Sequence, residues 1–291
     1  MISVIIPTYN RADFLKEAIQ SVLDQDYFAR GTPSHLFELI IVDDGSRDRT
    51  KEVIESFGKR VRYYYQSHKG VSAARNVGLS LSKGDTLAFL DSDDLWKKEK
   101  IRIQMRFMEA LPQAKVCYTE EIWLRRGTRL NPKKKHKKYS GWIFDKVLPL
   151  CLISLSSALF RREVFEEIGN FDETLPACED YDFSIRLAHK YPIYLISTPL
   201  IVKRGGHPDQ LSQKYTAMDR FRLKALLKAL RLDLTSEQER LVHLEIRKKC
   251  EILAKGYQKR GKLIQAKKYL RLIEKFGALI LLLSLGSQLP F

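Results

Sequence analysis

The stretch TLAFLDSDD, residues 86–94, decides the fold class. Its first five residues form a short apolar run of the kind found in buried strands, and three carboxylates follow where that strand would end. Strand-like runs at 2–7 and 36–42 are likewise followed by polar residues, and helical patterns at 13–23 and 71–81 lie among them. This alternation predicts an α/β fold built from βα units on a mostly parallel sheet flanked by helices.

The pattern changes beyond residue 95, and from residue 216 the chain is almost wholly helical in pattern. Residues 255–276 have the apolar spacing of a single helix–turn–helix unit. We expect an α/β domain over residues 1–213, divided near residue 95, and a basic helical region over 214–291. The other expected elements are helices at 49–57, 97–111, 162–168 and 179–190, and strands at 61–66, 115–124, 152–160 and 193–203.

Basic residues outnumber acidic ones, 51 Lys and Arg against 35 Asp and Glu, which gives a net charge of +16. Residues 125–138 hold eight basic residues and no acid, and residues 203–275 hold 20 basic residues against 8 acids. This excess predicts a polyanionic partner, either an anionic membrane surface or a phosphorylated substrate. Nucleic acid is disfavoured because the basic run is not interleaved with aromatic residues. The plain alternative for Lys133–Lys138 is a solvated loop.

The spacing of the cysteines and the lengths of the apolar runs indicate the cellular compartment. The cysteines are too far apart for a zinc site or a small disulfide framework, which favours a reducing, cytoplasmic setting. The run at 2–6 has no basic segment before it and predicts a strand, not a signal peptide. The run at 278–285 is shorter than the ~20 residues of a membrane-spanning helix. We expect the apolar tail that ends at Phe291 to pack or form a homodimer contact; a shallow, peripheral contact at the inner membrane face is the alternative.

Several motifs in fixed order resemble those of the family-2 glycosyltransferases, which share the nucleotide-binding fold called GT-A. They are Pro7-Thr8-Tyr9-Asn10-Arg11, Asp43-Asp44-Gly45-Ser46, GVSAARN at 70–76, Asp91-Ser92-Asp93-Asp94, Glu179-Asp180 and His207. The resemblance implies an inverting enzyme that moves a sugar from a nucleoside-diphosphate sugar, by family habit a UDP-sugar, to a hydroxyl acceptor in polysaccharide or glycan synthesis. It implies a nucleotide-sugar-binding half over 1–95 and an acceptor half over 96–213, with a saccharide or lipid-linked saccharide as acceptor.

The acidic stretch after residue 90 suits a divalent metal, since a metal held by carboxylates can offset the charge of a departing diphosphate. By resemblance Asp93 is the expected ligand of Mn²⁺ or Mg²⁺, with Asp94 sharing the role and His207 as a further ligand. Asp91 would reach the ribose. The alternatives are a solvated acidic turn and a solvated loop histidine. Lys203 and Arg204 could add charge for the phosphates, or could simply lie at an exposed strand end.

The nucleotide base is expected at the acidic turn, where by resemblance Asp44 contacts it, while Tyr9 could stack on the base or supply a hydroxyl. The alternatives are that Asp43 and Asp44 cap the helix that begins near Arg49, and that Arg75 is a surface residue. The full set of expected nucleotide-sugar contacts is Pro7, Thr8, Tyr9, Asn10, Arg11, Asp43, Asp44, Arg75, Asp91 and Ser92.

Inversion requires a base that takes the proton of the acceptor hydroxyl. By resemblance this base is Asp180, and Glu179 orients it or binds the acceptor. The alternative is that both acids only stabilise the positive end of a helix. Two other functions stay open at this point: a nucleotidyltransferase, disfavoured because no Gly-rich basic loop follows the first strand, and a non-catalytic scaffold that binds nucleotide sugars.

Overall fold

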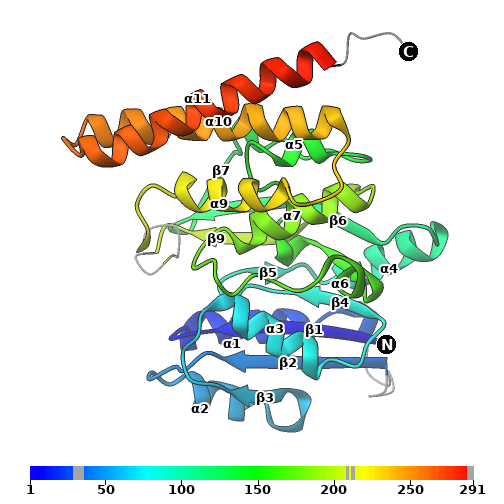
Figure 1. Cartoon of the computed structure of the whole chain (residues 1–291). Coiled ribbons are helices and arrows are strands. Elements are labelled where there is room, and N and C mark those ends of the chain that lie inside the picture. Colours follow the sequence, from blue (N-terminus) through cyan, green and yellow to red (C-terminus); the bar gives the residue numbers. More distant parts are fainter. Residues whose placement is uncertain (29–35, 208–209, 211–213, 287–291) are drawn as a thin grey trace.

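The computed structural model describes residues 1–28, 36–207, 210 and 214–286, with side chains up to residue 277. The described strands form one sheet in the order β3-β2-β1-β4-β8-β6-β9-β5, with β7 beside β6. Helices lie against this sheet, and the last two lie above it in the view of Figure 1. The predicted α/β class is confirmed.

The N-terminal half is the parallel part of the sheet. β1 pairs in parallel with β2 and β4, and β2 pairs in parallel with β3. Every residue of β1 is buried, because this largely apolar strand packs against helices on both faces. The elements in chain order are β1 (Ile2–Thr8), α1 (Ala12–Leu23), β2 (Phe37–Asp43), α2 (Thr50–Glu55), β3 (Arg62–Tyr65), α3 (Val71–Leu81) and β4 (Thr86–Phe89).

The second half makes the sheet mixed. β8 pairs antiparallel with both β4 and β6, β5 pairs antiparallel with β9, and β6 runs parallel to β9. The elements are β5 (Leu95–Trp96), α4 (Lys100–Ala110), β6 (Val116–Arg125), β7 (Thr128–Leu130), α5 (Phe144–Val147), β8 (Leu159–Arg161), α6 (Glu163–Ile168), α7 (Glu179–Lys190) and β9 (Tyr194–Gly205).

The strand expected at 152–160 is wrong for most of its length. Only β8 is a strand there, and Leu155–Ser157 forms a single 3-10 turn. The backbone carbonyls of this turn serve side chains instead of a neighbouring strand: Trp96 Nε1 donates to Ser156 O at 2.9 Å, and Gln104 Nε2 donates to Ser157 O at 3.0 Å.

The helices after residue 214 are α9 (Asp219–Ala229), α10 (Ser236–Gln258) and α11 (Leu263–Gly286). Thr235 begins α10 with a reciprocal capping pair with Gln238, and the turn at 259–262 produces the helix–turn–helix predicted for 255–276. Phe221, Leu226 and Ile246 share one apolar core with α7 and β6. In the described part of the chain, none of the helices is long and apolar enough to cross a membrane. The side chains of the apolar tail, and residues 287–291 entirely, lie outside the described residues.

Candidate functional site

A cleft of about 1230 Å³ opens where the parallel strands end, at the edge where α/β sheets bind ligands. Its lining comes from both halves of the sheet and from the chain just before α9. Of the residues predicted from the sequence, the cleft is lined by Pro7, Thr8, Tyr9, Asn10, Arg11, Asp44, Arg75, Asp91, Ser92, Asp93, Asp94, Glu179 and Asp180. The lining therefore gathers residues that are far apart in the chain.

Arg75 is the residue that joins the two acidic motifs. Its Nη2 atom donates to Asp91 Oδ1 at 2.8 Å, and its Nη1 atom donates to Glu179 Oε1 at 2.6 Å. The side chains of Arg75 and Glu179 are each only 5% exposed, so the interpretation of Arg75 as a surface residue is wrong. Burial raises the pKa of Glu179, the Arg75 guanidinium opposes this rise, and the charge of Asp180 adds to it.

Asp93 contacts His207 and Arg11 beside the carboxyl ends of the parallel strands. Asp93 Oδ2 lies 2.9 Å from His207 Nε2 and 3.1 Å from Arg11 Nη1. The His207 side chain is 11% exposed and its ring packs 5.1 Å from that of Phe14, so it is not a solvated loop histidine. A carboxylate and an imidazole in contact are a suitable pair of donors for a divalent cation.

Asp94 lies deeper than Asp93 and is nearly fully buried. Burial raises the pKa of Asp94 well above its usual value; Lys203 opposes this rise, and Asp93 and Asp91 reinforce it. Asp94 Oδ1 accepts from the backbone N–H of Arg204 at 3.2 Å. Because its carboxyl is held inside the protein, Asp94 is less suited than Asp93 to bind a metal at the surface of the cleft.

A buried ionic network under the cleft was not foreseen. Burial would lower the pKa of Lys203, but four carboxylates, of which Glu121 has the largest effect, raise it instead. Burial would likewise raise the pKa of Glu121, but Lys203 and Lys138 lower it to about 2. Lys138 Nζ donates to Glu121 Oε1 at 2.8 Å, so Lys138 is not part of a solvated loop, whereas Lys133–Lys135 are exposed. Lys203 is also not at an exposed strand end.

The Asp44 carboxylate organizes the loop at 66–70. It accepts from Gln66 Nε2 at 2.7 Å, from the backbone N–H groups of Lys69 and Gly70 at 2.8 Å each, and contacts His68 Nδ1 at 2.8 Å. These four contacts occupy the lone-pair positions of the carboxylate. A nucleotide base that used Asp44 as an acceptor would have to displace one of them. The exposed His68 ring, stacked on Tyr9 at 4.1 Å, is the donor with the most freedom to move.

The capping alternative for the acidic turn is not what the structure has. Asp43 Oδ1 accepts from the backbone N–H of Ser46 at 2.8 Å, and its Oδ2 accepts from Tyr63 Oη at 3.1 Å. Asp48, not Asp43 or Asp44, accepts from the backbone N–H at the start of α2. Asn10, with φ of +49°, ties the end of β1 to this turn through Ser46 and Arg47.

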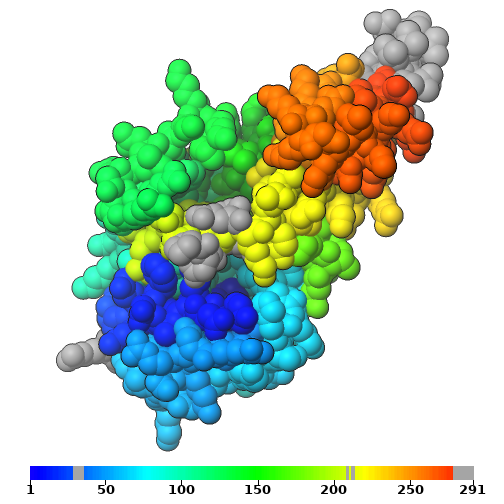
Figure 2. All heavy atoms as spheres, turned by 90° about the vertical axis from the view of Figure 1, so that its left-hand side faces the viewer, coloured from blue at the N-terminus to red at the C-terminus, as the bar shows by residue number. Residues whose placement is uncertain are grey.

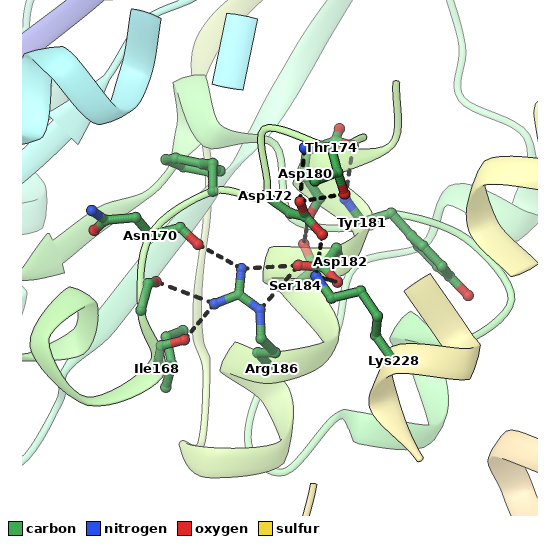
Figure 3. Close-up of polar contacts among 12 residues, drawn as sticks. Ile168, Asn170, Asp172, Thr174, Asp180, Tyr181, Asp182, Ser184, Arg186 and Lys228 are labelled. Carbon is green, nitrogen blue, oxygen red and sulfur yellow. Dashed lines mark hydrogen bonds and ion pairs between the residues drawn. The ribbon is translucent and has the colours of Figure 1, made fainter. Parts of the chain in front are cut away.

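The start of α7 is fixed from three sides, as Figure 3 shows. Arg186 joins Asp182 to the backbone carbonyls at 168–170, and Lys228 of α9 binds both Asp172 and Asp182. The helix is preceded by Cys178 in the left-handed region, with φ of +64°. Residues other than glycine rarely adopt this backbone conformation. Its strain persists only where surrounding contacts hold the residue in place. Asp180 is thereby held at the cleft, where it and Cys151 are neighbours.

Within the ranges that the structure describes, no group of three or more His, Cys, Asp or Glu side chains is arranged to hold a metal. Two cleft hydroxyls, Thr8 Oγ1 and Ser72 Oγ, are buried without a hydrogen-bond partner among the described residues. Buried hydroxyls of this kind are available to a polar ligand.

Comparison with known proteins places this cleft in context. The family model described as "Glycosyl transferase family 2" matches residues 3–169. An uncharacterized glycosyltransferase of Rickettsia felis is 35% identical over 200 residues, which are 66% of this chain and 31% of that relative. The chain thus spans about a third of the length of this relative.

Two solved structures share the fold. S. aureus TarS 1–349 in complex with UDP-GlcNAc superposes with a TM-score of 0.75 at 20% identity, over 96% of this chain and 83% of TarS. The mannosyltransferase PcManGT of Pyrobaculum calidifontis, in complex with GDP-Man and Mn²⁺, gives a TM-score of 0.59 at 19% identity, over 97% of this chain and 84% of that one.

Proposed function

The chain belongs to glycosyl transferase family 2, and from this membership we propose that it transfers a sugar from a nucleoside-diphosphate sugar to a hydroxyl acceptor with inversion. The observation that carries the proposal is the Arg75 bridge. By binding Asp91 and Glu179 at once, Arg75 brings the strand-end acids and the start of α7 to one cleft. An inverting transfer needs this arrangement, because donor phosphates and acceptor base must act on opposite faces of one sugar.

The donor is proposed to lie across the ends of β1, β2 and β4. Its base would lie beside Tyr9 and the Asp44 loop, with UDP as the first nucleotide to test because TarS binds UDP-GlcNAc with this fold. The ribose and phosphates would then reach Asp91 and Asp93. Arg11, which contacts Asp93, adds positive charge for the diphosphate.

A divalent cation is proposed as part of the donor complex. Asp93 and His207 supply two suitable donor atoms, and the remaining oxygens would come from the diphosphate, as is usual for Mg²⁺ bound with a phosphate substrate. When bound, the cation offsets the negative charge that develops on the leaving diphosphate. The PcManGT complex, which contains Mn²⁺, supports testing this ion first.

Asp180 is proposed as the base. Its backbone lies in the first turn of α7, where its Oδ1 atom accepts from the N–H of Tyr181 at 2.7 Å, and it lines the cleft beside Arg75 and Lys203. Arg75 holds Glu179 through its Oε1 atom, whereas Oε2 is buried without a hydrogen-bond partner among the described residues. Because of the buried pair with Arg75, Glu179 is proposed to position this turn, not to take the proton. The acceptor is proposed to be a saccharide or lipid-linked saccharide in glycan synthesis. The four free cysteines favour a cytoplasmic site of action.

The experiment combines a panel of sugar nucleotides with Mn²⁺ or Mg²⁺ and measures release of the nucleoside diphosphate, with and without saccharide acceptors. One donor should be consumed in preference to the others. Asp180→Asn should lower transfer by roughly 10²–10⁴-fold, the usual contribution of a general base, while donor affinity stays near that of the wild type. Transfer at the wild-type rate by Asp180→Asn would remove Asp180 from this role. Binding of a donor without consumption of any donor would favour the non-catalytic scaffold instead.

A further inference from the structure

The turn between α10 and α11 carries exposed apolar side chains among basic ones. Leu263 is 60% exposed and Ile264 is 84% exposed, and both lie in the first turn of α11. Residues 255–275 contain eight basic residues and one acid. Two adjacent large aliphatic side chains in water do not contribute to the core, so their presence here points to a partner surface.

A second basic segment lies on the same face of the molecule. In Figure 2 the segment around 125–138 (green) and the α10–α11 turn (orange) both face the viewer, above the N-terminal half (blue). Figure 2 looks at the side toward which β2 points in Figure 1, which is the side of the strand ends and the cleft. The exposed basic residues of this segment are Arg125, Arg126, Arg129, Lys133, Lys134, Lys135 and Lys137.

We propose that this face docks on an anionic lipid surface, with Leu263 and Ile264 inserted among the headgroups and the two basic segments on the lipid phosphates. Charge alone would suit any polyanion. The apolar pair favours a lipid interface over a dissolved polyanion. Transfer of aliphatic side chains out of water lowers the free energy, and a lipid surface allows this transfer. Docking in this orientation turns the mouth of the cleft toward the membrane. The proposal goes beyond sugar transfer and does not depend on it.

The test is co-sedimentation of the full chain with vesicles, without sugar nucleotide. Vesicles of phosphatidylcholine with phosphatidylglycerol should bring the protein down, and phosphatidylcholine alone should not. Binding should fall steeply as salt is raised, because salt screens the attraction between exposed charges.

Two pairs of variants separate the apolar from the electrostatic contribution. Leu263→Ser/Ile264→Ser, which leaves the charge unchanged, should weaken binding roughly tenfold or more, whereas Leu36→Ser, at an exposed residue before β2 on the opposite side, should not. Lys259→Ala/Lys262→Ala should weaken binding about 25-fold, since each basic residue near an anionic surface contributes about 1 kcal/mol. Lys59→Ala/Lys83→Ala removes the same charge at the amino ends of β3 and β4 and should have little effect.

Three outcomes would overturn the proposal. Equal binding to neutral vesicles would exclude anionic lipid as the partner. Unchanged binding by the Leu263→Ser/Ile264→Ser variant, with loss by the lysine variant, would mean that the attraction is electrostatic only and that the apolar pair does not insert. Equal losses in the control variants would show that only net charge matters. Circular dichroism and the urea-unfolding midpoint of each variant establish that the fold is intact. Because neither measurement uses a nucleotide, a failure here is distinct from a failure of the proposed transfer.

Discussion

Arg75 on α3 and Glu179 on α7 are 104 residues apart in the chain, yet Arg75 Nη1 and Glu179 Oε1 are 2.6 Å apart. Both side chains are buried, and Arg75 is also bound to Asp91. A buried charge that loses its partner is costly, because no water replaces the lost contact. The ion pair therefore couples the stability of the protein to the geometry of the cleft.

Arg75→Met should lower the free energy of unfolding by about 3–5 kcal/mol, because it leaves Asp91 and Glu179 without a cation. The double variant Arg75→Met/Glu179→Gln should recover part of this loss, since one of the stranded charges is gone. Urea unfolding of the single and double variants measures both effects. Arg240→Ala, which breaks a surface pair with Glu237 whose side chains are 35% and 61% exposed, is the control and should unfold like the wild type. A single variant as stable as the double would contradict the coupling.

Asp93→Asn should weaken UDP binding in the presence of Mn²⁺ and abolish the difference between binding with and without the ion. The reason is that the amide keeps the shape of the side chain but loses the charge that a divalent cation requires. Isothermal titration with UDP, with Mn²⁺ and then with EDTA, makes the comparison. Asp85→Asn, at the amino end of β4, should behave as the wild type. Metal-dependent affinity that survives Asp93→Asn would place the cation elsewhere.

Asp44→Ala and His68→Ala should have opposite consequences for nucleotide affinity. Removing Asp44 frees the N–H groups of Lys69 and Gly70 and should disorder the loop at 66–70, where we propose that the base binds, so UDP binding should weaken. Removing His68 takes away the ring that stacks on Tyr9, while the other three donors to Asp44 remain. UDP affinity of His68→Ala should then be equal or higher. A large loss in His68→Ala would mean that His68 itself holds the nucleotide.

Lys100 should make the protein more stable as the pH rises. It is completely buried, with its Nζ atom 4.0 Å from the centre of the Trp96 ring, and burial lowers its pKa to about 7. The unfolded chain binds this proton up to the ordinary lysine pKa, so between about pH 7 and pH 10 it holds more protons than the folded chain and stability increases with pH. Lys100→Met should flatten this slope and stabilise the protein at pH 7 by roughly 2–4 kcal/mol. Denaturant unfolding from pH 6 to pH 10 measures this, with exposed Lys98→Met as the matched control. Parallel slopes for wild type and Lys100→Met would refute it.

Local pattern predicted the parallel half of the sheet well, because β1, β2 and β4 are mostly apolar segments that can be recognised without knowledge of distant residues. It also predicted that polar residues would gather at the strand ends. It could not predict the Arg75 bridge, since nothing near residue 75 indicates residue 179. The strand expected at 152–160 failed for a related reason: the side chains of Trp96 and Gln104 bind the carbonyls of Ser156 and Ser157.

The surroundings of charged residues were also poorly predicted from the sequence. Lys138 belongs to the basic run by composition, yet it is buried against Glu121, and the signal that separates it from Lys137 is the carboxylate on β6. The expectation for His207 stood on resemblance, and its contact with Asp93 is what the fold adds. Contacts between such side chains depend on which strands are neighbours in the sheet. The apolar runs in the sequence did not predict the mixed order β4-β8-β6-β9.

The clamp of Lys228 on Asp172 and Asp182 has a consequence for synthesis on the ribosome. The chain leaves the exit tunnel from its amino end, so β1–β4 can assemble while the second half is still being made. Arg75 would be without Glu179 until α7 has emerged, and α7 would be without its clamp until α9 has followed. The strand ends that we propose to hold the nucleotide base are thus formed early and the proposed acceptor side late. A nascent chain stalled before residue 228 is therefore expected to bind a nucleotide before it can catalyse the proposed transfer.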